Sequence, residues 1–139
     1  MLTTRLLHPE ILSALGSAGH GSRVLIADGN YPFTTGSSPA AKHVFLNLRP
    51  GLASVIDVME VLVPSIPIEA ALVMAPPDGP EPPVFAEFRR LLPAGVALER
   101  KQRLDFYEAA KTPDVALVIA TGEQRIYANI MLVIGVVKP

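Results

Sequence analysis

Two patterns of apolar residues alternate along the chain. Short continuous runs rich in β-branched residues predict buried strands, most clearly at 23–27, 69–74 and 115–120. Stretches with apolar residues three or four positions apart predict helices, and the stretch at 52–63 ends where Pro64 interrupts it. Further helices are expected at 8–18, 84–92 and 103–111, and further strands at 44–48, 96–100 and within 126–137.

This alternation of strands and helices predicts an α/β fold. We expect a single domain over residues 1–139, with a mixed, largely parallel sheet flanked by helices. A loop rich in Gly, Ser, Thr and Pro runs from Asp28 to about Lys42. Loops of about 15 residues are uncommon inside a compact domain and are often functional, so this segment is a candidate site region.

Composition narrows the function classes. Half of the residues are hydrophobic and 18% are charged, which is fewer than the roughly one quarter usual in globular chains. We therefore expect a full core and some apolar surface for partner subunits. The net charge is −1, with no long run of one sign. This balance argues against binding to nucleic acid or to an acidic membrane surface.

The residue inventory excludes several chemistries. The chain has no cysteine, so it has no disulfide, thiolate nucleophile or cysteine-bound metal. Its three histidines do not show the spacing of paired metal ligands, and nucleotide-binding glycine motifs and a nucleophile elbow are missing. The apolar run Ile130–Ile134 is far below the ~18 residues of a membrane span. Without a signal-peptide pattern at the start, we expect a cytoplasmic protein.

Candidate chemistry lies on either side of the first predicted strand. His20 stands between two glycines just before residues 23–27, and Asp28 follows directly after them. A histidine gains or loses a proton near neutral pH, and the glycines allow a ligand to come close. On spacing alone, the same residues also suit a helix-capping glycine, a surface histidine and a turn aspartate.

An ordered set of short motifs resembles the D-ribose pyranase and L-fucose mutarotase family. Each motif is weak alone, but together they cover the chain in order and at matching separations. The matching pieces are Gly19-His20-Gly21, Ala27-Asp28 with Pro32, Arg103–Glu108, Thr121-Gly122-Glu123, and Tyr127-Ala128-Asn129 with the apolar run that follows.

The resemblance implies an isomerase that interconverts the cyclic forms of a free monosaccharide without a metal or other cofactor. In the family, the histidine matching His20 is the proton donor and the aspartate matching Asp28 binds the sugar. The positions matching Arg103 and Tyr127 through Asn129, including Ala128, complete the site. Tyr107 is either an apolar platform for the sugar or a core residue. The family also implies ring-shaped homo-oligomers, commonly decamers, with sites between neighbouring subunits.

The resemblance leaves the sugar open between two branches. Arg103, followed by an aromatic pair, is typical of fucose-type members, whereas ribose-type members carry histidine there. In contrast, Tyr127-Ala128-Asn129 resembles the ribose branch, and Ser22 and Gly29 depart from the fucose pattern. We favour L-fucose or a related sugar, with D-ribose pyranase as the alternative. A non-enzymatic sugar-binding accessory protein and a ring-forming scaffold remain the other classes of function.

Overall fold

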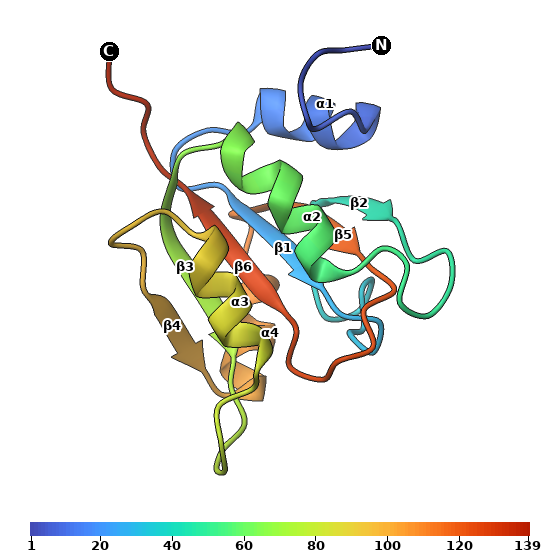
Figure 1. The fold of residues 1–139 in the computed structure, drawn as a ribbon, viewed down its shortest axis with the longest axis vertical. Helices are drawn as coiled ribbons and strands as arrows, with labels where there is room; N and C mark the ends of the chain where they lie inside the picture. The colour runs from blue at the N-terminus through green and yellow to red at the C-terminus, as the bar shows by residue number, and fades with distance from the viewer.

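The apolar runs form the strands of one six-stranded sheet. The computed structural model describes all residues from Met1 to Pro139 (Figure 1). Its strands are β1 (Arg23–Ala27), β2 (Lys42–Phe45), β3 (Ile68–Met74), β4 (Leu98–Lys101), β5 (Val115–Ala120) and β6 (Ile130–Ile134).

Four α-helices connect these strands. They are α1 (Pro9–Ser17), α2 (Val55–Leu62), α3 (Val84–Leu91) and α4 (Arg103–Ala110), and a 3₁₀ turn follows α2 at Val63–Ser65. The local sequence determines where several of these helices begin or end. For example, Ser54 and Asp57 form a reciprocal capping box that starts α2.

The sheet is mixed, as predicted, with the strand order β2-β5-β1-β6-β3-β4. Parallel pairs join β2 to β5, β5 to β1, and β3 to β4. The last strand, β6, lies between β1 and β3 and runs antiparallel to both. The carboxyl ends of β1 and β3 and the amino end of β6 therefore lie side by side at one end of the sheet.

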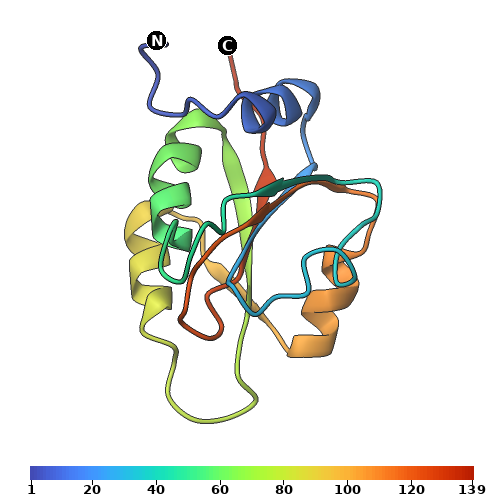
Figure 2. The same cartoon turned by 90° about the vertical axis from the view of Figure 1, so that its right-hand side faces the viewer.

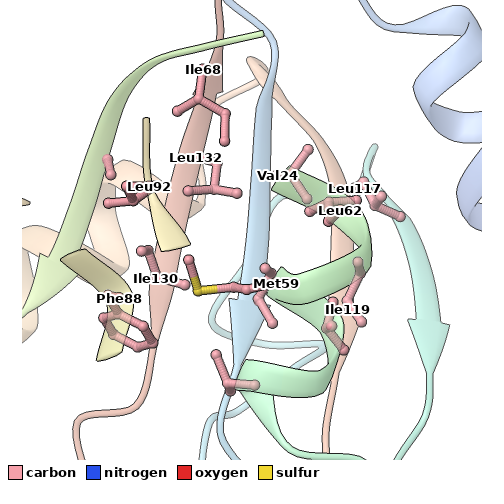
Figure 3. Close-up of a cluster of buried hydrophobic side chains, with 14 of the residues drawn as sticks. Val24, Met59, Leu62, Ile68, Phe88, Leu92, Leu117, Ile119, Ile130 and Leu132 are labelled. Atoms are coloured by element: carbon pink, nitrogen blue, oxygen red, sulfur yellow. The ribbon is translucent and has the colours of Figure 1, made fainter. Parts of the chain in front are cut away.

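Helices cover both faces of the sheet, so most strands have two buried sides. Figures 1 and 2 show α2 and α3 on one face, α4 on the other, and α1 across one end. Successive strand residues point to opposite faces, and in β1 Val24 and Ile26 join the larger core while Leu25 and Ala27 join the smaller one. Met59 of α2 lies over the sheet among Phe88, Ile119 and Ile130 (Figure 3).

Several element boundaries differ from the sequence-based expectation; helix α2, for example, begins at Val55 rather than at residue 52. Strand β2 ends at Phe45 rather than at residue 48, because Leu48 and Arg49 turn back to bond with Leu52. Strand β4 begins two residues later than expected, at Leu98. Strand β6 begins only at Ile130, because Tyr127 has a left-handed backbone with φ of 61°, which a continuous strand cannot include.

Candidate functional site

Asp28 and Asn129 form a buried pair at the end of the sheet where β1 ends and β6 begins. The backbone N–H of Asp28 donates to Asn129 Oδ1 at 2.8 Å, and Asn129 Nδ2 donates to Asp28 Oδ2 at 2.9 Å. The N–H of Asn30 donates to Asp28 Oδ1 at 2.9 Å. Asp28 and Asn129 are each only 3% exposed. These bonds fix both side chains while leaving further acceptor positions on the carboxylate and one amide hydrogen on Asn129.

Burial changes the proton affinity of Asp28. Loss of water around the carboxylate raises its pKa above the ordinary value of 3.8, and hydrogen bonds from Asn30 and Asn129 offset part of this rise. Asp28 is therefore a better proton and hydrogen-bond acceptor than an exposed carboxylate.

Asp28 and Asn129 open into a hollow of about 280 Å³ that also brings in residues from distant parts of the chain. It contains five of the residues singled out in the sequence, namely Asp28, Arg103, Tyr107, Tyr127 and Asn129. The remaining lining residues are Asn30, Tyr31, Met74 and Ile126.

Helix α4 supplies Arg103 and Tyr107 to this hollow. The two residues are four positions apart and share one helix face, whereas Phe106 and Ala110 are fully buried against the sheet and hold the helix in place. Arg103 makes no ion pair within the chain, so its guanidinium is available to a ligand.

The backbone is important at two of the expected binding residues. Tyr127 lines the hollow and has a left-handed backbone, a conformation that is uncommon outside glycine and tends to occur at functional sites. Ala128 is fully buried in the core beneath α2 and α3. Only its backbone can therefore face a ligand.

His20 lies at the opposite end of β1 from Asp28. It borders a separate hollow, beside Ser22 and Glu69, and its Nε2 lies 3.0 Å from Glu69 Oε2. The five residues of β1 alone span about 16 Å of extended chain. One copy of the chain therefore does not bring His20 to the Asp28 hollow.

The comparison with known proteins identifies the family. The profile described as the RbsD / FucU transport protein family matches residues 1–137. The chain belongs to this family. This confirms the resemblance found from the motifs.

Its relatives include enzymes of both branches. It is 32% identical to the fucose mutarotase of Homo sapiens, over 94% of this chain and 90% of the relative. It is 33% identical to the D-ribose pyranase of Variovorax paradoxus, over 98% of each. The structure of Bacillus subtilis RbsD complexed with D-ribose superposes with a TM-score of 0.80 at 25% identity, covering 99% of this chain and 100% of that one. Near-equal identity to the two enzymes does not select a sugar.

Tyr31 is a lining residue of this RbsD/FucU protein that sequence reasoning missed. Its hydroxyl donates to the carbonyl of Gly36 at 2.6 Å, and its ring packs edge-on against Tyr107 at 5.4 Å. Burial, together with nearby Tyr107 and Asp28, raises its pKa, so the phenol stays neutral. Its place after Asp28 in a loop was the only sequence signal for such a role.

Glu123 of the matched Thr121-Gly122-Glu123 motif supports the site rather than lining the hollow. Burial alone would raise its pKa, but hydrogen bonds from Arg125 lower it overall. Its carboxylate accepts from Arg125 Nε at 3.0 Å and from the backbone N–H of Val55 at 3.4 Å, at the start of α2. The motif thus ties the loop after β5 to a helix.

Two further observations concern metals and membranes. No three His, Asp or Glu side chains lie close enough together to hold a metal ion. None of the helices combines the length and apolar character that crossing a membrane requires.

Proposed function

We propose that this protein interconverts the cyclic forms of a free monosaccharide, with L-fucose or a related sugar as first candidate and D-ribose as the alternative. The observation that carries the proposal is the convergence of Asp28, Arg103, Tyr107, Tyr127 and Asn129 on one hollow. At about 280 Å³ this hollow is at the small end of ligand pockets, which suits a single sugar ring. Family membership supports the same chemistry.

The lining groups match what a sugar presents. The Asp28 carboxylate accepts hydrogen bonds from hydroxyl groups, and Arg103 offers a planar set of donors to hydroxyl oxygens. The second amide hydrogen of Asn129 remains free for an oxygen of the sugar. Tyr107 stands against Tyr31 and offers its ring to the apolar face of the sugar.

His20 is the proposed acid–base group. Its imidazolium gives a proton to the ring oxygen, and the bond from that oxygen to the anomeric carbon breaks with its electron pair moving to the oxygen. The anomeric hydroxyl loses its proton to water, and its electron pair forms the carbonyl of the open chain. Closure reverses these steps on either face or through another hydroxyl. A positioned acid–base group contributes roughly 10²–10⁴-fold, and this chemistry needs no metal or redox cofactor.

We further propose that His20 acts in the hollow of a neighbouring copy, within a ring-shaped homo-oligomer such as a decamer. The separation of His20 and Asp28 along β1 supports this arrangement. Exposed apolar side chains also support it. Ile126 lines the hollow, Leu104 lines an adjoining hollow that shares Arg103 and Tyr127, and both are 67% exposed. In this proposal residues 1–139 form one mutarotase-like domain, and the cysteine-free chain works in the reducing cytoplasm.

Proton NMR exchange at equilibrium, on L-fucose and D-ribose separately, tests the proposal. We expect the wild-type protein to speed exchange between ring forms of at least one sugar, and His20→Ala to abolish this effect. Acceleration of ribose alone would assign the protein to the pyranase alternative. If neither sugar exchanges faster but both signals broaden on binding, the accessory function replaces the enzymatic one.

A further inference from the structure

The side chain of Glu69 makes a two-oxygen contact with His20. Nε2 of His20 lies 3.0 Å from Glu69 Oε2 and 3.2 Å from Oε1. The Nδ1 atom of His20 makes no hydrogen bond within the chain. The two residues are 49 positions apart in sequence, so the fold and not local chain geometry brings them together.

A β-bulge at Glu69 sets the direction of this side chain. Strands β3 and β6 pair Ile68 with Ile134 and Ala70 with Val133, which leaves Glu69 as an extra, unpaired residue. Such a bulge redirects a side chain, and bulges are common beside active sites.

The carboxyl end of β6 also holds the His20 loop, from the side of β1. Gly21 donates its N–H to the carbonyl of Ile134 at 2.9 Å, and Ile134 donates to the carbonyl of Ser22 at 2.9 Å. Next to it, a side chain at Gly135 would begin 3.2 Å from Glu69 Cβ and 3.6 Å from Oε2. The bulge and the histidine loop are thus anchored to one short segment, which fixes their relative position.

From these contacts we propose that Glu69 is a positioning residue that holds His20 by Nε2 and leaves Nδ1 as the nitrogen that exchanges the proton with the sugar. The inference rests on the proposed role of His20. A carboxylate beside Nε2 keeps a hydrogen on that atom in both the neutral and the charged ring. In the imidazolium form Nδ1–H gives its proton to the ring oxygen, and the neutral ring keeps the hydrogen on Nε2.

The pair contributes little to folding. The side chains of His20 and Glu69 are 60% and 45% exposed, and ion pairs at such positions add little to stability. Glu69→Gln and Glu69→Ala are therefore expected to fold normally, which circular dichroism checks. Glu10→Gln is the matched control, because Glu10 is similarly exposed, pairs with Lys42, and makes no hydrogen bond or ion pair with His20.

The test measures sugar exchange rates against sugar concentration for these variants and for His20→Ala. We expect Glu69→Gln to lower kcat by about 10- to 100-fold, a part of the effect of a positioned acid–base group. Its KM should stay within about a factor of two, because the sugar contacts lie on other residues. Glu69→Ala should lower kcat further than Glu69→Gln, and the kcat of Glu10→Gln should match that of the wild type.

Nitrogen-15 NMR of the imidazole gives a second readout that a purely structural role would not move. In the neutral ring of the wild type, the hydrogen should be on Nε2 alone, and Glu69→Ala should show a mixture of tautomers. Wild-type kcat in both Glu69 variants, or a neutral wild-type ring whose hydrogen is on Nδ1, would overturn the inference. A fully active His20→Ala would instead overturn the proposed function, so the two failures are distinguishable.

Discussion

At the scale of single residues, Asp28 links the stability of the protein to its proposed function. A carboxylate at a buried strand end costs stability, and its bonds to Asn30 and Asn129 recover only part of this, since its pKa remains raised. The same burial gives a sugar hydroxyl a strong acceptor from which water is largely excluded. We infer that the residue is kept for binding and not for folding.

This raised pKa gives a signed prediction for stability against pH. The folded protein binds the Asp28 proton more tightly than the unfolded chain, so protonation stabilises the fold. The stabilisation of the fold by protonated Asp28 is complete below pH 3.8, the ordinary pKa, and is lost as pH rises through the raised pKa. Relative to Asp28→Asn, the wild-type free energy of unfolding in urea should therefore increase as pH falls from neutral toward 4. A relative decrease over that range would contradict the assignment.

Some of the site residues could be found from the sequence, and others could not. Five lining residues carry motif signals, whereas the separation of His20 from Asp28 within one chain becomes clear from the structure, in which β1 lies between them. Tyr31 and Glu69 could not be found from such motifs. Their roles depend on the packing of Tyr31 against α4 and on a bulge in the pairing of β3 with β6, and neither leaves a local pattern.

At the scale of elements, the loops behind the site are packed backbone against backbone. Gly122 donates its N–H to the carbonyl of Ala53 at 2.9 Å and accepts from Gly51 at 2.6 Å. A side chain there would begin 2.6 Å from the carbonyl oxygen of Leu52 and would also meet that of Arg49. Only glycine lets the loop after β5 approach this turn.

We therefore expect Gly122→Ala to lower the free energy of unfolding by about 1–3 kcal/mol, as overpacked sites do. Gly16→Ala is the control, because nothing lies within 4 Å of the position near the end of α1. In a helix, alanine is favoured over glycine by up to about 1 kcal/mol, so this variant should be as stable as the wild type or slightly more stable. Equal urea midpoints for Gly122→Ala and the wild type would rule out the tight packing.

Element prediction succeeded where local pattern decides and failed where tertiary contacts decide. The apolar runs at 23–27 and 115–120 match β1 and β5 to the residue, because both strands are buried on two faces. The end of β2 and the start of β6 depend on a turn bonded to Leu52 and on the left-handed Tyr127. The insertion of β6 between β1 and β3 is likewise a property of the whole sheet.

At the scale of the whole molecule, we propose that the site is divided between copies. The His20–Glu69 pair and the Asp28 hollow lie at opposite ends of the sheet, so an assembly that joins unlike ends would create complete sites. Such head-to-tail contacts generate rings when the rotation closes. The exposed Leu104 and Ile126 beside the hollow would be buried in that contact.

Complementation between two inactive variants tests this claim most directly. His20→Ala and Asp28→Asn are co-expressed with different tags, the hybrids are purified through both tags, and sugar exchange is measured by NMR. We predict recovery of about one quarter of wild-type activity in evenly mixed hybrids, because half of the copies carry an intact His20 and half an intact Asp28. Hybrids of His20→Ala with the double variant His20→Ala/Asp28→Asn should stay inactive. Mixed hybrids as inactive as their parents would contradict a site shared between copies.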